Sequence, residues 1–237
     1  MNMVPNTSAW RDAGDGGRER PAAAPPRLIV GISGASGVIY GIRMLQTLRL
    51  LGVETHLVMS RSAEITAAME TGWKIADIRA LASVAHPIDD IAASISSGSF
   101  RTLGMVVAPC SMRSMSEIAC GTTTSLLSRA ADVVLKERRR LVLMVRETPL
   151  HLGHLRTMTA LSEMGAILAP PVPAFYAKPA DLDDMIDHTV GRVLDLFDLD
   201  SGKVRRWGET ARRSGRSPAH RDPERAAEPA GDSVLDT

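Results

Sequence analysis

The chain has 237 residues, of which 44% are hydrophobic but only 3% aromatic, and its formal net charge at pH 7 is +1. This length and composition allow one substantial core built mainly from aliphatic side chains, as in parallel α/β sheets. A charge near zero provides no global field for nucleic acid or an anionic membrane, so we expect neither as a partner and look for a local anion site. Two cysteines, with no signal peptide and no long apolar span, predict a cytoplasmic protein without a disulfide framework.

Both ends of the chain differ in composition from its middle. Residues 1–26 are rich in Gly, Pro, Ala and charge and show no apolar periodicity, which predicts a disordered N-terminal extension. Residues 210–237 have the same character, and the basic residues there lack the interleaved aromatics of a nucleic-acid-binding segment. The sequence therefore predicts one folded domain at 27–200 and a C-terminal tail at 201–237.

Within this domain, strand-like and helix-like segments alternate. Strands are predicted at 27–33, 53–60, 103–111, 140–147 and 166–170. Helices are predicted at 38–52, 62–72, 114–120, 122–139, 149–165 and 181–199, with Pro149 in the first turn of one and Asp181 capping another. The alternation predicts an α/β fold in which a parallel sheet is sandwiched by helices.

In an open parallel sheet, ligands bind beyond the carboxyl ends of the strands. The loop GISGASG has glycines at 31, 34 and 37, and the loop APCSMRS supplies hydroxyl groups at a helix start, so both could hold a phosphate. The glycine spacing is not GxGxxG, and no acid ends the second strand, which favours a mononucleotide over NAD. For GISGASG alone, a tight turn without a ligand is an equally good interpretation.

Several reactive side chains have simple structural interpretations. Cys110 could be a nucleophile, but no histidine is near it in sequence, and a buried cysteine at a strand end is favoured. His151 and His154 fit HxxH without further ligands, so we expect them to pack or hydrogen-bond on a helix, and we predict no metal. The run Arg138–Arg140 is interpreted as a solvated face.

Four charged residues form a different pattern. Arg129 and Lys136 are seven residues apart and share one helical face, while Arg146 and Glu147 end a strand that is predicted to be buried. A charged pair is costly to bury unless something anionic lies opposite it. Together these residues could hold a phosphate and protonate it as it leaves.

Six motifs occur in order: GISGASG, APCSMRS, RAADVVLKERR, VRETPLHLGHLR, PPVPAFY and HTVGRVLD. With these motifs the sequence closely resembles the UbiX-type flavin prenyltransferases over residues 27–200 and again at RRWGE, 205–209. The resemblance implies a Rossmann-like or flavodoxin-like single domain that assembles as a homododecamer with active sites at subunit interfaces. It implies transfer of the dimethylallyl group of dimethylallyl monophosphate to N5 and C6 of reduced FMN, without a metal. The product, prenylated FMN, would serve a UbiD-type decarboxylase.

The same resemblance implies roles for individual residues. FMN binding would fall to Gly34, Ala35, Ser36, Ser60, Ser111, Met112, Arg113, Ser114 and Arg146. The prenyl-phosphate site would involve Ser97, Arg129, Lys136, Glu147, Tyr176 and Arg192. Catalysis would fall to Ser36, Glu70, Lys136, Glu147 and Trp207.

The implied chemistry suits these residue types. Lys and Arg can stabilise the phosphate that leaves an allylic carbon, and Glu147 can deliver a proton to it. Ser36 and Glu70 would remove the ring proton at C6. Trp207 would offer a π face to an allylic cation from a segment ordered over the active site, although a tryptophan that merely anchors the tail is the alternative.

Two departures from the family pattern bear on local contacts: Ile91 stands where some members have tryptophan, and CGTTTSLL replaces a more usual Asn-Gly-Tyr-Ser-Asp-Asn-Leu run. Two other functions remain as alternatives. One is a flavin-dependent cysteinyl decarboxylase, whose usual histidine and Pro-x-Met-Asn-x-x-Met motifs we do not find. The other is an FMN-binding carrier subunit of an aromatic-acid decarboxylase complex.

Overall fold

The computed structural model describes residues 25–208, so the disorder predicted for residues 1–26 and 210–237 lies, except at residues 25 and 26, outside the described residues. A six-stranded, fully parallel sheet forms the centre, with strand order β3-β2-β1-β4-β5-β6. The strands are β1 (Arg27–Ile32), β2 (Glu54–Met59), β3 (Val84–His86), β4 (Gly104–Cys110), β5 (Arg140–Val145) and β6 (Ile167–Leu168). The predicted α/β architecture with a parallel sheet is confirmed.

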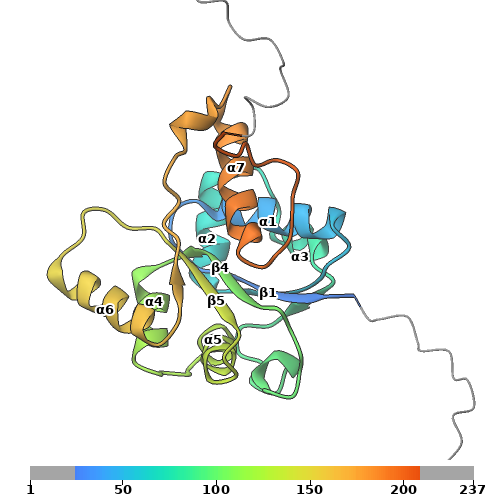
Figure 1. Cartoon of the computed structure of the whole chain (residues 1–237). Coiled ribbons are helices and arrows are strands. Elements are labelled where there is room, and N and C mark those ends of the chain that lie inside the picture. Colours follow the sequence, from blue (N-terminus) through green and yellow to red (C-terminus); the bar gives the residue numbers. More distant parts are fainter. Residues whose placement is uncertain (1–24, 209–237) are drawn as a thin grey trace, which may run out of the picture.

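Helices cover both faces of this sheet (Figure 1). One face carries α1 (Val38–Leu50), α2 (Arg61–Glu70), α3 (Ile75–Leu81) and α7 (Leu182–Asp195). The other carries α4 (Met112–Ala119), α5 (Leu126–Lys136) and α6 (Leu152–Glu163), and short 3₁₀ turns occur at η1 (Ser94–Ser96) and η2 (Phe175–Ala177). Alternate residues of each strand enter the two cores: Val106 faces α1 and α7, while Val107 faces α4 and α5.

Three local predictions were wrong. No element is predicted in the segment 75–86, yet it forms α3 and the edge strand β3. The strand is only three residues long and mostly exposed, so it lacks an apolar pattern. Pro149 precedes α6 rather than lying in its first turn, because the imidazole of His151 caps the helix by accepting a hydrogen bond from the His154 N–H at 3.3 Å. The helix expected from 122 begins at Leu126, after a capping box between Ser125 and Ser128.

The strands define two edges of the sheet. We call the edge where strands begin the amino edge and the edge where they end the carboxyl edge. Helix α5 runs from the carboxyl edge, where the Leu126 N–H bonds to the Ile88 carbonyl, to the amino edge just before β5. At about 1.5 Å per residue, its two ends are roughly 15 Å apart. The first and last residues of α5 therefore serve opposite edges.

Helix α1 approaches the sheet unusually closely at Gly41. A Cβ atom built there would lie 2.4 Å from the Ala108 carbonyl oxygen and 2.7 Å from Ile32 Cδ1. Only glycine permits this approach, which sets the position of α1 and of the loop before it against the ends of β1 and β4. Within residues 25–208, no helix has the length and apolar character needed to cross a membrane.

Candidate flavin site

The strand order reverses between β1 and β4, and the two loops that follow these strands are tied together there. Ser33 is fully buried; its hydroxyl donates to the Pro109 carbonyl at 2.8 Å and accepts from the Ser111 N–H at 2.7 Å. The carboxyl end of a parallel sheet at such a switch point is where ligands bind in this class of fold. Sequence reasoning missed Ser33, although its place directly after the first strand was the available signal.

A cavity of about 480 Å³ opens at this switch point. Five of the nine residues predicted to bind FMN line it: Gly34, Ser60, Ser111, Arg113 and Ser114. Other lining residues were not predicted, among them the Arg61–Asp89 ion pair (2.8 Å) and Ser62, Thr124 and Ser125. Gly34 is required for the cavity's shape, because a Cβ there would lie 2.3 Å from Ser62 Oγ.

Two serines begin helices at the cavity wall. Ser60 caps α2 by accepting from the Ala63 N–H at 3.1 Å, and Ser111 caps α4 by accepting from the Ser114 N–H at 3.3 Å. Both helices therefore direct their N-terminal partial positive charge toward the cavity, which favours a phosphate. Arg113 adds an exposed guanidinium held by Glu117 at 2.9 Å. The cavity offers hydroxyl groups and two helix N-termini that suit a phosphate-bearing ligand such as a flavin mononucleotide, while its two arginines are each paired with a carboxylate of the wall.

The Ser36–Glu70 pair predicted for proton removal is assembled in the chain. Glu70 is the last residue of α2, and its carboxylate accepts from the Gly37 N–H at 2.8 Å, the Val38 N–H at 3.4 Å and the Ser36 hydroxyl. Burial raises the pKa of Glu70, but these hydrogen bonds and the charge of Arg146 outweigh it, so the net pKa lies below the ordinary value. Glu70 is thus an ionised carboxylate at neutral pH, and its partner Ser36 stands two positions along the chain from Gly34 in the wall of the flavin cavity.

Arg146 and Glu147 follow β5 at the carboxyl edge, but both are exposed in the single chain. The cost of burying a charged pair therefore does not arise within one subunit. Arg146 lies near Glu70 and also near Tyr40, where burial raises the pKa of the phenol and the Arg146 charge lowers it, with a net rise. Glu147 accepts from the Thr148 N–H at 2.9 Å. Tyr40 had no signal in the sequence that set it apart from a core tyrosine.

The residues predicted to hold the prenyl donor fall into separate groups. Lys136 and Ser97 lie together at the amino edge, where Gly98 packs against Lys136 and Glu137. Lys136 Nζ bonds to Glu137 at 2.5 Å. Arg129, nearer the N-terminus of α5, bonds to Asp132 at 2.8 Å. Since the flavin cavity lies at the carboxyl edge, Lys136 and Ser97 do not reach it within one chain.

The run Arg138–Arg140 was predicted to be a solvated face, and this is wrong for Arg139. Arg139 is half-buried and donates to the Gly98 and Phe100 carbonyls, at 2.7 Å each. Arg140 pairs with Asp198 at 2.6 Å. Arg139 therefore fixes the loop that carries Ser97 against the end of α5, a role that a run of charges in a sequence does not reveal.

Tyr176, Arg192 and Trp207 form the second group. Tyr176 and Arg192 line a cavity of about 400 Å³ beside β6 and α7. The Tyr176 ring meets the Trp207 ring edge-on, with centroids 5.6 Å apart, and meets His188 in the same way at 5.7 Å. Trp207 is 83% exposed in the single chain and does not line the flavin cavity. Its π face is therefore open to an additional group.

The cysteine and histidine predictions can be compared with the structure directly. Cys110 is fully buried, which raises its pKa to about 12, as the interpretation of a buried strand-end cysteine requires. The ring centroids of His151 and His154 lie 3.5 Å apart at the start of α6, and the His151 ring accepts from the His154 backbone N–H, so the two rings pack as expected, although Nδ1 of His154 is buried without a hydrogen-bond partner among the described residues. Among residues 25–208, no group of three or more His, Cys, Asp or Glu side chains is arranged to hold a metal ion.

Comparison with known proteins agrees with this geometry. The family described as Flavoprotein matches residues 18–194. A flavin prenyltransferase UbiX of Thauera aromatica is 59% identical over 181 residues, covering 76% of this chain and 93% of that protein. The UbiX of Escherichia coli K12 is 63% identical over 172 residues, covering 72% of this chain and 91% of that protein. The chain belongs to the UbiX flavin prenyltransferase family.

Solved structures of UbiX proteins have the same fold. AnUbiX (PadA1), crystallised in complex with FMN and dimethylallyl pyrophosphate, is 53% identical with a TM-score of 0.77, covering 78% of this chain and 98% of that one. A dodecameric FMN-dependent UbiX-like decarboxylase from Escherichia coli O157:H7 is 52% identical with a TM-score of 0.75, covering 76% and 98%. A PPC decarboxylase is similar at 18% identity and a TM-score of 0.51, which shows a shared fold alone.

The two departures from the UbiX pattern lie in different places. Thr124 and Ser125, from the CGTTTSLL segment, line the flavin cavity, so this departure changes its wall. Ile91 is 46% exposed and is not part of that wall. The first departure therefore bears on flavin contacts directly, and the second does not within one chain.

Proposed function

We propose that the protein is a flavin prenyltransferase that joins the dimethylallyl group of dimethylallyl monophosphate to N5 and C6 of reduced FMN, giving prenylated FMN. The observation that carries this proposal is the ionised Glu70 carboxylate, hydrogen-bonded to Ser36, beside a hydroxyl-lined cavity at the switch point of the sheet. Membership of the UbiX family, and the FMN and dimethylallyl pyrophosphate bound in AnUbiX, support it.

On the flavin side, the proposed roles follow from position. Gly34, Ala35, Ser36, Ser60 and the segment Ser111–Ser114 would hold FMN at the helix N-termini, with Arg146 adding a positive charge. When bound, reduced FMN supplies the nucleophilic atoms that take the dimethylallyl group. Glu70 would then accept a proton through or beside the Ser36 hydroxyl, for which its lowered pKa keeps it deprotonated.

On the donor side, the proposed residues stabilise and protonate a leaving phosphate. Arg129, Lys136 and Arg192 would bind its oxygens, with Ser97 and Tyr176 as hydroxyl donors, and Glu147 would supply a proton. Trp207 would present its exposed ring to the allylic cation.

These donor residues lie at different edges of one subunit, so a complete site requires more than one copy of the chain. We propose that the protein assembles as a homododecamer, as does the Escherichia coli O157:H7 relative. Exposed apolar side chains one helical turn apart on α2 and on α6 are surfaces that such an assembly could cover. They are Ile65 and Met69 on α2 and Leu152 and Leu155 on α6.

The decisive experiment is anaerobic incubation of the purified protein with reduced FMN and dimethylallyl monophosphate, followed by mass spectrometry of the extracted flavin. We expect a flavin heavier by one dimethylallyl unit. The diphosphate is tested in parallel, because the AnUbiX complex contains dimethylallyl pyrophosphate. Recovery of unmodified FMN with both donors would contradict the proposed function.

A flavin carrier would bind FMN without making a bond. Glu147→Gln distinguishes carrier from enzyme: it leaves the flavin cavity intact, so flavin delivery should be unchanged, whereas prenyl transfer should slow about 100-fold if Glu147 is the acid. A cysteinyl decarboxylase would instead release CO₂ from a peptide with a C-terminal cysteine. We propose that the product passes to a UbiD-type decarboxylase in the cytoplasm, which co-expression and cell fractionation would test.

A further inference from the structure

The last described residues, 199–208, lie along α7; we call them the C-terminal strap. A Cβ at Gly191 of α7 would lie 2.6 Å from both Ser201 Oγ and Val204 Cγ2, so the strap contacts the helix where it has no side chain. Arg205 donates to the Ala177 and Lys178 carbonyls at 2.6 and 3.0 Å. The strap ends at Trp207 and Gly208, next to Tyr176.

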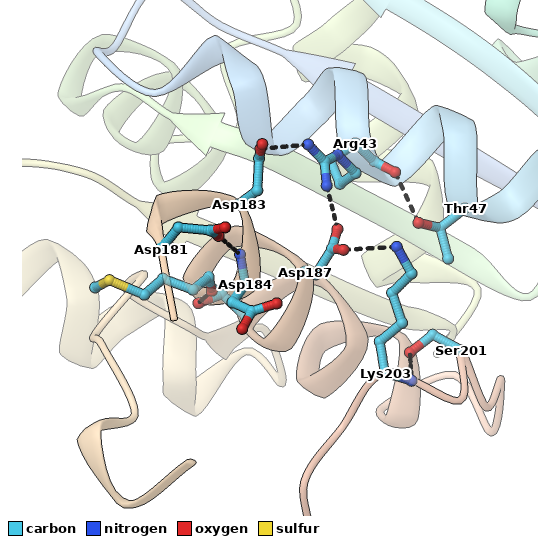
Figure 2. Close-up of polar contacts among 10 residues, drawn as sticks. Arg43, Thr47, Asp181, Asp183, Asp184, Asp187, Ser201 and Lys203 are labelled. Atoms are coloured by element: carbon cyan, nitrogen blue, oxygen red, sulfur yellow. Dashed lines mark hydrogen bonds and ion pairs between the residues drawn. The ribbon is translucent and has the colours of Figure 1, made fainter. Parts of the chain in front are cut away.

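Two aspartates of α7 each bind one cation of the strap and one cation of a helix. Asp187 accepts from Lys203 of the strap at 2.6 Å and from Arg43 of α1 at 2.5 Å, which is visible in Figure 2 together with the second contact of Arg43, to Asp183. Asp195 accepts from Arg206 of the strap through both carboxylate oxygens, at 2.9 and 3.0 Å, and from Arg192 at 2.5 Å. The two aspartate side chains are only 17% and 15% exposed.

Asp195 is the more informative of the two, because both of its partners belong to the proposed donor site or border it. Arg192 lines the cavity that contains Tyr176, and Arg206 precedes Trp207. A bidentate bond fixes the Arg206 guanidinium in orientation as well as in distance. One carboxylate thus connects a proposed phosphate ligand with the residue beside the proposed π surface.

We propose that Asp195 is a positioning residue for prenyl transfer: it orients Arg192 toward the donor phosphate and, through Arg206, holds Trp207 against Tyr176. This inference rests on the proposed function and deepens it. Asp187 and Lys203 anchor the middle of the same strap to α1, so the strap is attached at two points before it reaches Trp207.

The direction of the change in KM separates positioning from a purely electrostatic role. Asp195→Asn removes one negative charge and leaves Arg192 and Arg206 in place, so a purely electrostatic role predicts tighter binding of the phosphate. Positioning predicts the opposite. We expect the KM for dimethylallyl monophosphate to rise at least about fivefold and kcat to fall by a similar factor. An unchanged or lower KM would overturn the proposal.

The matched control is Asp198→Asn. Asp198 directly precedes the strap, but its side chain is 80% exposed, makes an ion pair of 2.6 Å with Arg140 and does not line the donor cavity. It has a φ of 61°, a conformation that asparagine adopts as readily as aspartate. We expect wild-type kinetics from this variant.

Limited trypsin digestion of the assembled protein without ligand provides an independent readout. We expect cleavage after Lys203, followed by mass spectrometry, to be at least about tenfold faster in Asp195→Asn and in Arg206→Gln than in the wild type or in Asp198→Asn. Arg206→Lys keeps the charge without the bidentate bond and should give an intermediate rate. Unchanged cleavage in both Asp195→Asn and Arg206→Gln would refute the attachment of the strap through Arg206 and Asp195.

Arg206→Gln also keeps the proposal testable if Asp195→Asn does not fold. It removes the attachment of the strap next to Trp207 but leaves Arg192 bonded to Asp195, so we expect kcat to fall while the KM for the donor stays within about twofold of wild type. A wild-type kcat for this variant would overturn the link to Trp207. If the wild type makes no prenylated flavin, the proposed function fails. The digestion measurements still decide whether Asp195 attaches the strap through Arg206.

Discussion

The carboxylate of Glu70 belongs to α2 but is held by the loop that starts α1. Thirty-three residues separate Glu70 from the Gly37 N–H that it accepts from. A sequence read by periodicity shows only an acid at the end of a surface helix, so the role of Glu70 followed from the family resemblance and not from local pattern. The structure adds the physical reason for its ionised state, which is three hydrogen bonds and a nearby guanidinium that outweigh burial.

The first prediction concerns this carboxylate. Glu70→Gln keeps the size of the side chain but removes the proton acceptor, so we expect FMN to bind and prenylated FMN to form about 100-fold more slowly. Mass spectrometry of flavin extracted at timed intervals measures the rate, and flavin absorbance of the purified protein measures occupancy. A wild-type rate would show that another group accepts the proton.

The second prediction concerns Asp187. Burial raises its pKa, but the hydrogen bonds from Lys203 and Arg43 and their charges outweigh burial and lower it overall. A lowered folded-state pKa adds stability that is fully present above the ordinary aspartate value and is lost as pH falls through the lowered value. Asp187→Asn should therefore reduce the free energy of unfolding by about 2 kcal/mol at pH 7.

The pH dependence of that difference is the test. The gap between wild type and Asp187→Asn should remain constant from pH 7 to about pH 5 and shrink below about pH 4. Thermal unfolding at fixed protein concentration measures it, with the exposed Asp198→Asn as the control. A gap that persists unchanged at pH 3 would mean that packing, and not the ion pairs, accounts for the loss.

Among the elements, α1 has the tightest contact with the sheet. The third prediction is that Gly41→Ala destabilises the protein by about 2 kcal/mol, because its Cβ would overlap the Ala108 carbonyl. Gly72→Ala is the matched control: its Cβ meets nothing within 4 Å, and Gly72 has no positive φ, so we expect a neutral or slightly stabilising effect. Chemical denaturation compares the two, and equal effects would contradict the packing argument.

The same elements show what a sequence can and cannot predict. The apolar runs of β1, β2, β4 and β5 identified the sheet because buried parallel strands are hydrophobic on both faces. β3 was not predicted, because an exposed edge strand of three residues carries no such pattern. The carboxyl-edge loops were predicted from the positions where the strands end, and five predicted residues line one cavity. The cap at His151 required geometry that no spacing rule contains.

At the scale of the whole molecule, the proposed site is divided between the two edges of the sheet. Glu70 lies at the carboxyl edge, and Lys136 at the far end of α5 lies at the amino edge. The fourth prediction is that co-expressed Glu70→Gln and Lys136→Ala subunits, each strongly slowed alone, regain about a quarter of wild-type activity, because random assembly places two intact residues together in that share of sites.

Complementation separates two arrangements. If both residues of a site came from one subunit, the mixed protein would be as inactive as its parents. The control is a mixture of Glu70→Gln with Ser36→Ala, whose altered residues belong to the same pair in one chain. This mixture should not regain activity, and recovery in it would contradict the arrangement proposed here.

The complete burial of Cys110 has a practical consequence for experiments on this protein. A thiol with a pKa of about 12 and no exposed surface is a poor nucleophile, whereas the chain's second cysteine, Cys120, is exposed at the end of α4. A maleimide dye should therefore attach to one position per folded chain without any engineering. Since α4 begins at the flavin cavity, that dye would report on the site from the opposite end of the same helix.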